Sequence, residues 1–168
     1  MKKIIFLFLC GFILAEDEFM DLNGLMQYDN TEYIAQFKIS VEKCNVDNAD
    51  SCYLAGYYLY GGTGVKVNYE VANKFYDKAC RLNDKDGCSS LALAYIFGIG
   101  VKKNFQIAEK YSKKACNLGN GLSCYYIGTE YETGDNLLKN IKTAKEYYKK
   151  ACNLGYSEGC KNYARITN

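Results

Sequence analysis

Residues 114–124 read Lys-Ala-Cys-Asn-Leu-Gly-Asn-Gly-Leu-Ser-Cys, and three altered copies of this stretch occur elsewhere in the chain. Its two cysteines are eight positions apart. Three further cysteine pairs have the same spacing, and each pair begins 36 residues after the one before: Cys44 and Cys52, Cys80 and Cys88, and Cys152 and Cys160. A fixed period of this length is typical of repeat arrays. We therefore expect the chain to fold as a stack of similar units.

Length and charge limit the possible classes of protein. A chain of 168 residues can form one ordinary domain or about four solenoid units, and it is too short for two large domains. The formal charge of +2 comes from Lys2 and Lys3, because 19 basic and 19 acidic residues remain without them. No excess of positive charge is left to attract a nucleic acid or an anionic membrane.

The first fifteen residues have the pattern of a secretory signal peptide. Lys2 and Lys3 precede an apolar run over residues 4–14, and Ala15 stands before three acidic residues. A permanent transmembrane helix would need about 20 apolar residues. We expect an exported protein, periplasmic or secreted, with no membrane anchor in the mature chain.

Two details of this segment leave alternatives open. Attachment of a lipid to Cys10 would require a small residue before the cysteine, and Leu9 is not small. Ile13 is larger than signal peptidase usually favours at the third position before the cut. The lipoprotein alternative is therefore disfavoured, and the cleavage site is not fixed to the residue.

Eight of the nine cysteines lie in the exported part, all in the regular pairs. An even set in an exported protein is typical of a disulfide framework, and we expect one local bridge per pair. Closing so short a loop removes roughly 2.5 kcal/mol of unfolded-chain entropy, so four bridges would contribute on the order of 10 kcal/mol. A metal site is disfavoured because the chain has no histidine and lacks the close cysteine spacing of structural zinc sites. We expect no cofactor.

Within each unit, small residues recur at one phase of a first helix, where two helices can approach closely: Gly56, Ala92, Gly128 and Ala164. That helix is expected to end at a glycine, and a second permissive residue follows two positions later: Gly62 and Gly64, Gly98 and Gly100, Gly134 and Asn136. Glycine and asparagine both tolerate the left-handed conformation that helix ends require.

An asparagine then precedes the second helix of each unit, where its side chain can cap the first turn: Asn68, Asn104 and Asn140. Apolar residues follow at helical spacing up to the cysteine, which predicts one buried stripe on this helix. The ends of the array are expected to be atypical. Residues 16–43 are predicted to form degenerate capping helices, with an apolar pattern that starts at Phe19, and the array itself covers 44–168 and ends in a short cap helix from Cys160.

These features resemble the Sel-1-like repeat family, a relative of the tetratricopeptide repeats. The second unit carries the resemblance in Ala92, Tyr95, the Gly-Ile-Gly-Val of 98–101, Ala108 and the Tyr-Ser-Lys-Lys-Ala of 111–115. The cysteine pair in every unit is similar to the disulfide-rich exported branch of that family, the Helicobacter cysteine-rich proteins and their relatives. The resemblance implies an all-α, right-handed α/α solenoid of about four 36-residue helix pairs with one disulfide per repeat. The third unit departs from the pattern, because Asn136 replaces its second glycine.

The resemblance leaves two classes of function open, because members of that branch carry the name β-lactamase while the architecture generally serves as a binding scaffold. The chain contains one Ser-x-x-Lys motif, Ser40 to Lys43, but neither of the companion motifs of serine β-lactamases. Without histidine, a Ser-His-Asp triad is excluded. Ser40 and Lys43 are thus weak catalytic candidates for slow β-lactam hydrolysis, and the simpler interpretation is a chance spacing on a lysine-rich helix.

A binding scaffold is the favoured class. On each first helix, the face opposite the small residues varies between copies: Tyr53, Tyr57 and Tyr60 in the first, Ser89, Leu93 and Ile96 in the second, Tyr125, Thr129 and Glu132 in the third. First helices line the concave surface of such solenoids. The sequence predicts a groove that is aromatic at its amino-terminal end and suits a protein, a peptide or a peptidoglycan fragment, with β-lactams as the alternative ligand. The alternative for the tyrosines is packing against adjacent repeats. We expect a monomer.

Overall fold

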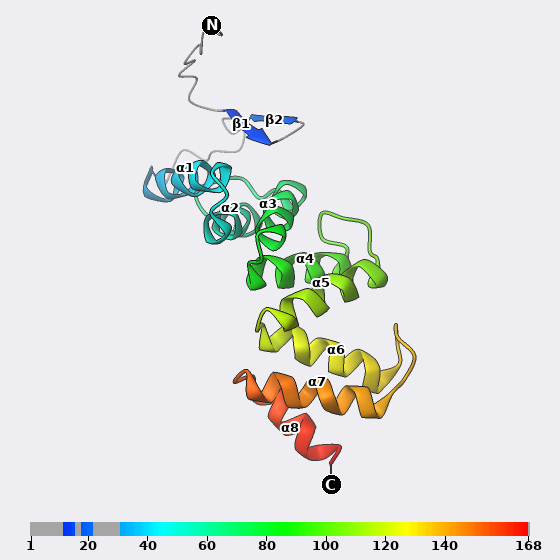
Figure 1. The fold of residues 1–168 in the computed structure, drawn as a ribbon. Helices are drawn as coiled ribbons and strands as arrows, with labels where there is room; N and C mark the ends of the chain where they lie inside the picture. Colours follow the sequence, from blue (N-terminus) through cyan, green and yellow to red (C-terminus); the bar gives the residue numbers. More distant parts are fainter. Residues whose placement is uncertain (1–11, 16–17, 22–30, 168) are drawn as a thin grey trace, which may run out of the picture.

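The structure is a computed structural model that describes residues 12–15, 18–21 and 31–167. In these residues a short antiparallel hairpin of β1 (Phe12–Ala15) and β2 (Glu18–Asp21) precedes eight helices (Figure 1). The helices are α1 (Thr31–Asn45), α2 (Ala49–Gly61), α3 (Tyr69–Arg81), α4 (Lys85–Phe97), α5 (Phe105–Asn117), α6 (Gly121–Thr133), α7 (Ile141–Asn153) and α8 (Ser157–Arg165). The helical part is the predicted α/α solenoid.

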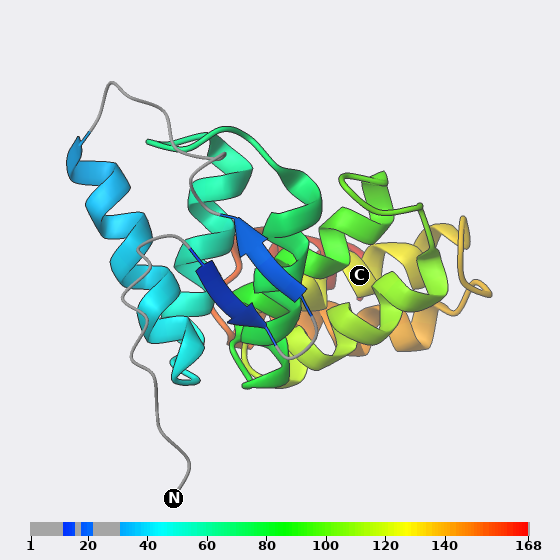
Figure 2. The ribbon, with the colours of Figure 1, turned by 90° about the horizontal axis from the view of Figure 1, so that it is seen from above.

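The helices stack as pairs along one axis. α2 packs most extensively on α3, α4 on α5 and α6 on α7, and these pairs are the three complete repeats. α1 and α8 cover the two ends (Figure 1). Seen from above in Figure 2, α1 and α2 lie to one side and α6 and α7 to the other, so the repeats are displaced progressively along the array.

The predicted caps form at both ends of the helices. Asn68, Asn104 and Asn140 each accept a hydrogen bond from a backbone N–H three residues later, at 3.0 Å. The first helices α2, α4 and α6 end at left-handed glycines: Gly62 at φ 69°, Gly98 at 74° and Gly134 at 80°. These sequence-based predictions of the helix boundaries are confirmed.

The second permissive position behaves differently in the third repeat. Gly64 and Gly100 have φ values of +72° and +65°, whereas Asn136 does not adopt a positive φ. The expectation that asparagine would copy the glycine conformation here is wrong, because a side chain at this position meets more steric resistance than glycine does.

All four predicted disulfides are present, one per repeat. They join Cys44 to Cys52, Cys80 to Cys88, Cys116 to Cys124 and Cys152 to Cys160, with Cα–Cα distances of 4.6, 4.5, 4.8 and 4.4 Å. Each bridge links the end of one helix to the start of the next. Because they close the links between successive helix pairs, the bridges hold one repeat to its neighbour.

The buried core follows the stack and is not continuous. One cluster extends from Phe37 of α1 to Leu91 of α4, and a separate cluster contains Ile127 of α6 and Ala151 of α7. A small group around Ala115 lies between them. Repeat proteins have no single deep core, so each junction between repeats must be stabilised by its own contacts.

The amino-terminal segment departs from the predicted helices. Phe19 lies in strand β2 instead of a helix, and residues 22–30 of the same predicted helix lie outside the described residues. The helix expected after them is present as α1. The signal-peptide prediction falls mostly on residues 1–11, which are also outside the described part, and it stays a prediction. None of the helices described is long and apolar enough to cross a membrane.

Candidate binding surface

The tyrosines of α2 form the largest exposed aromatic group on a first helix. Tyr57 and Tyr60 are 53% and 43% exposed, and Tyr53 is half-buried with its ring 5.8 Å from that of Tyr76 on α3. Tyr69, the first residue of α3, adds a further ring, which meets Tyr60 edge-on at 5.2 Å and is itself exposed. We refer to Tyr53, Tyr57, Tyr60 and Tyr69 as the tyrosine patch.

Sequence reasoning missed Tyr69. The residue that follows each capping asparagine is apolar or aromatic in all three repeats: Tyr69, Phe105 and Ile141. That recurrence marks a position that faces the end of the preceding first helix. It could have placed Tyr69 beside Tyr60, because the two residues flank the same turn.

The hydroxyl groups of Tyr53 and of Tyr76 beneath it stay protonated. Burial raises the pKa of Tyr53, and the carboxylates of Asp86 and Asp84 raise it further. Burial also raises the pKa of Tyr76, whose ring supports the patch from below. These phenols therefore remain neutral at ordinary pH and can both donate and accept hydrogen bonds.

The second repeat contributes less to this surface than the sequence predicted. Ser89 is buried, and its Oγ accepts a hydrogen bond of 2.9 Å from the hydroxyl of Ser123. It therefore holds α4 to α6 and is not part of an exposed groove. Leu93 and Ile96 are partly exposed.

In the third repeat the predicted residues contact one another through Tyr148. Tyr125 packs on the ring of Tyr148 at 5.7 Å, and the Tyr148 hydroxyl donates to Thr129 at 3.3 Å and to Glu132 at 2.7 Å. Arg165 of α8 donates to both carboxylate oxygens of Glu132, at 2.6 and 2.7 Å. The Arg165 guanidinium holds the pKa of Glu132 below its usual range. This end of the predicted groove is occupied by intramolecular bonds.

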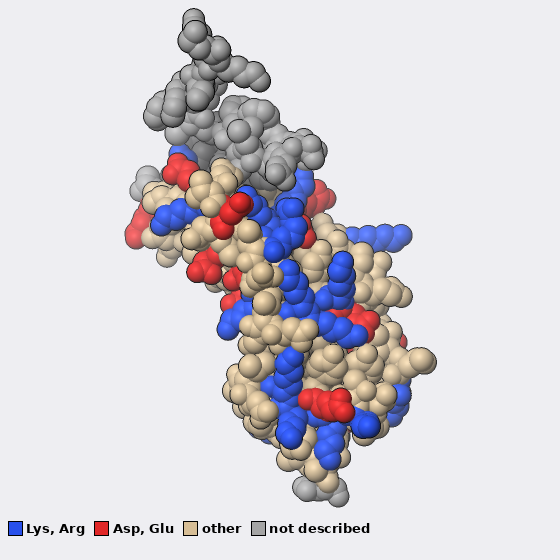
Figure 3. All heavy atoms as spheres, in the orientation of Figure 1, with Lys and Arg blue, Asp and Glu red and all other residues tan. Residues whose placement is uncertain are grey.

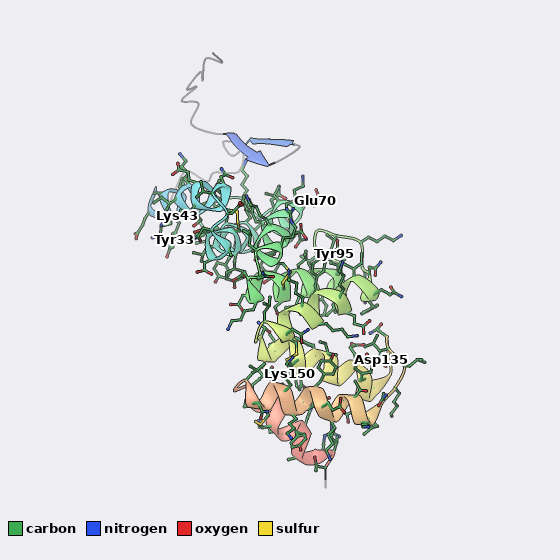
Figure 4. All side chains as sticks on the ribbon, viewed as in Figure 1. Tyr33, Lys43, Glu70, Tyr95, Asp135 and Lys150 are labelled. Atoms are coloured by element: carbon green, nitrogen blue, oxygen red, sulfur yellow. A yellow bond between two sulfur atoms is a disulfide. The ribbon has the colours of Figure 1, made fainter. Side chains whose placement is uncertain are left out.

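Other tyrosines serve the alternative role of packing between helices. Tyr95 of α4, labelled in Figure 4, stacks on Tyr111 of α5 with ring centroids 6.0 Å apart, and Tyr131 stacks on Tyr147 at the same distance. The Tyr111 hydroxyl donates to Asp77 at 3.0 Å, and burial together with this carboxylate raises the pKa of Tyr111 to about 12. The two interpretations of the tyrosines thus apply to different residues.

Charge is distributed unevenly between the two kinds of helix. The second helices α3, α5 and α7 together carry ten basic and four acidic residues. The first helices α2, α4 and α6 together carry one basic and four acidic residues. Figure 3 shows basic side chains along much of the face in view. The small net charge of the chain therefore conceals basic second helices and weakly acidic first helices.

The two catalytic candidates do not form a site. Ser40 is 6% exposed, and its hydroxyl donates to the backbone carbonyl of Gln36 at 2.8 Å. Lys43, labelled in Figure 4, is exposed on α1, and no hydrogen bond joins its side chain to Ser40 among the described residues. A nucleophile needs both access to substrate and a base within hydrogen-bond reach. In the described part of the chain, Ser40 has neither access to a substrate nor a base within hydrogen-bond reach.

Comparison with known proteins agrees with the stacked helix pairs. A family model described as Sel1 repeat matches residues 49–84, 86–120 and 121–156. No curated protein matches the chain.

Three solved structures are similar over most of the chain. A Sel1 repeat protein from Oxalobacter formigenes is 24% identical with a TM-score of 0.72 over 77% of this chain and 53% of its own. The protein c5321, a protective antigen of uropathogenic Escherichia coli strains with an SLR fold, is 27% identical with a TM-score of 0.74. The match covers 80% of this chain and 29% of c5321. Helicobacter pylori cysteine rich protein B is 28% identical with a TM-score of 0.64. The match covers 80% of this chain and 96% of the Helicobacter protein.

This chain thus spans about half of the Oxalobacter protein and less than a third of the E. coli antigen, but nearly all of the Helicobacter protein. The helix-pair units seen in the structure coincide with the three segments that the family model matches, and these cover more than half of the sequence. The chain belongs to the Sel1 repeat family.

Proposed function

We propose that this protein is an exported binding scaffold that holds a peptide segment of a partner protein against the first helices, with the tyrosine patch as its anchor. The exposure of Tyr57 and Tyr60 carries this proposal. A contiguous group of exposed aromatic side chains is typical of an interaction site, and tyrosine is enriched where proteins bind one another.

The position of the first helices supports the same surface. α2 contacts α4 and α6 contacts α8, while no comparable contact joins α3 to α5 or α5 to α7 in the described residues. Helices on the inner side of a curved stack lie closer together than those on the outer side. This arrangement favours the first helices as the concave lining, as in other solenoids.

The weakly acidic first helices bear on the class of ligand. With four acidic residues and one basic residue on α2, α4 and α6, this side favours a neutral or basic segment over an anionic one. A peptide fits this requirement better than a strongly anionic polymer. Export is supported by the four disulfides, which form and persist in oxidising compartments.

The test is selection of peptides from a displayed random library on the oxidised protein, followed by measurement of their affinity. We expect enriched peptides to bind the Tyr57→Ala/Tyr60→Ala variant about tenfold more weakly, a loss of about 1.4 kcal/mol. The matched control is Leu138→Ala, which removes an exposed apolar side chain from the turn of the third repeat and should leave affinity unchanged. Failure to enrich any sequence, or equal binding by the double variant, would contradict the proposal.

A further inference from the structure

A recess opens at the junction between the second and third repeats, away from the tyrosine patch. Its apolar walls are Ile96, Phe105, Ile127 and Leu137, and Glu109 and Glu130 lie beside them. It contains about 350 Å³ of empty space, its open mouth included. Only part of this space is enclosed, because the figure includes the solvent-open mouth, so the recess is a shallow site with room for one side chain at most.

The turn of the third repeat is one cause of the recess. In the second repeat, Gly100 sits so close to the start of α3 that a Cβ there would lie 2.5 Å from the backbone carbon of Tyr69. The corresponding residues one repeat later are Asn136 and Phe105. A residue with a side chain cannot approach as Gly100 does, so the turn over residues 134–137 does not close on Phe105 in the same way.

A lost hydrogen bond is the second cause. At the earlier junction, the Asn73 side-chain amide donates to the carbonyl of Ile99 in the next turn at 2.7 Å. The corresponding residue in α5 is Glu109, and a carboxylate has no proton to donate to a carbonyl. Glu109 instead accepts from Lys113 at 2.6 Å and from the Tyr131 hydroxyl at 3.4 Å.

A small side chain on α5 is the third cause. The position is that of Tyr76 in the first repeat and Tyr148 in the third, and each of these tyrosines lies over a glycine of the paired first helix. The second repeat has Ser112 at this phase and Ala92 in place of the glycine. Ser112 lines the recess, so no tyrosine ring occupies this position of α5. Three departures from the repeat pattern thus coincide at one junction.

We infer that this recess is a binding site for a large apolar side chain that is followed by a basic residue in a peptide segment. The apolar walls would cover the side chain, and Glu130 is placed to meet the cation. Glu130 accepts a hydrogen bond of 2.7 Å from the neutral side-chain amide of Asn136, and no ion pair involves Glu130 in the described residues. The neighbouring cations are engaged, Lys113 by Glu109 and Lys103 over the ring of Phe105 at 4.7 Å. The site is independent of the tyrosine patch, so either proposal can fail alone.

The probe is a blocked tetrapeptide, Gly-Phe-Arg-Gly, titrated into the isotopically labelled oxidised protein and followed by NMR. We expect its addition to shift the backbone amides of Ile96, Phe105 and Ile127. Replacing Phe by Ala in the peptide should weaken binding more than tenfold, and replacing Arg by Gln about threefold to tenfold. Equal binding of the three peptides, or shifts confined to the tyrosine patch, would overturn the inference.

Two variants locate the binding. Glu109→Asn/Asn136→Gly restores the hydrogen-bonding residue and the turn glycine of the earlier junction, and should weaken binding of the Phe-Arg peptide at least tenfold. Glu130→Gln should lower its affinity to that of the Phe-Gln peptide. Glu70→Gln, at the start of α3 and exposed, is the matched control and should change nothing. Undiminished binding by Glu130→Gln or by the folded double variant would overturn the inference.

Discussion

At the scale of single residues, the tyrosines divide by what lies beneath them. Tyr76 and Tyr148 are buried over glycines, whereas Tyr57 and Tyr60 have no such cover and remain exposed. The same residue type therefore builds the inside of a repeat and supplies its candidate binding surface. For Tyr76 and Tyr148, the small residue opposite leaves the room in which the ring is buried.

Gly56 provides a test of this pairing. A Cβ at Gly56 would lie 2.7 Å from the ring of Tyr76, and both residues are buried, so the ring or the helix must move to admit it. We expect Gly56→Ala to lower the free energy of unfolding by about 1 to 3 kcal/mol. Urea denaturation of the oxidised protein measures this change.

Gly61 is the matched control on the same helix. Its nearest contact for an added Cβ is the Thr63 hydroxyl at 3.4 Å, and the residue is exposed. The free energy of unfolding of Gly61→Ala should stay within about 0.5 kcal/mol of that of the wild type. Equal stability of the two variants would show that the tyrosine does not depend on the glycine beneath it.

The residues that sequence analysis predicted best are those whose role is local. A capping asparagine or a helix-ending glycine acts within a few positions of itself, so Asn68 and Gly62 could be assigned from spacing alone. The burial of Ser89 could not, because it depends on Ser123, which lies on α6 in the next repeat. Exposure on a solenoid is set by the neighbouring repeat as much as by the helix itself.

At the scale of elements, each disulfide joins a second helix to the first helix of the next repeat. The two cysteines of the Cys80 to Cys88 bridge are buried, whereas those of the Cys152 to Cys160 bridge are partly exposed at the end of the array. Replacing Cys80 and Cys88 by alanine should lower the free energy of unfolding by about 2.5 kcal/mol, the closure entropy of a loop of this length. Non-reducing urea denaturation provides the measurement.

The terminal bridge offers the comparison. Cys152→Ala/Cys160→Ala should chiefly loosen α8, because in a stack each repeat contacts only its neighbours. Amide hydrogen exchange should then accelerate in α8 while the main unfolding transition moves less than in the central variant. An equal shift of the main transition in both variants would show that the bridges stabilise the array as a whole.

At the scale of the whole molecule, the period in the sequence was sufficient to predict the stack, its helix pairs and its bridges. The recess was not predictable in the same way. It requires knowing that Glu109 and Ser112 of α5 meet Asn136, which lies in the turn of the next repeat, at one junction. Periodicity identifies equivalent positions, and only the packing of one repeat on the next shows which of them face each other.

That junction should also divide the array during unfolding. α5 and α6 have the least extensive contact of any two consecutive helices in the described part. The buried cluster of α1 to α4 is separate from that of α6 and α7, which includes only Cys116 of α5. Cooperativity in a solenoid depends on the interface between neighbours. We expect amides of α6, α7 and α8 to become exchangeable at a lower urea concentration than those of α2, α3 and α4, as measured by native-state hydrogen exchange. The variant Glu109→Asn/Asn136→Gly restores the features of the earlier junction. In it, the two groups of amides should become exchangeable at similar urea concentrations. Coincident exchange in the wild type would mean that the bridge from Cys116 to Cys124 at this junction is enough to couple the halves despite the recess.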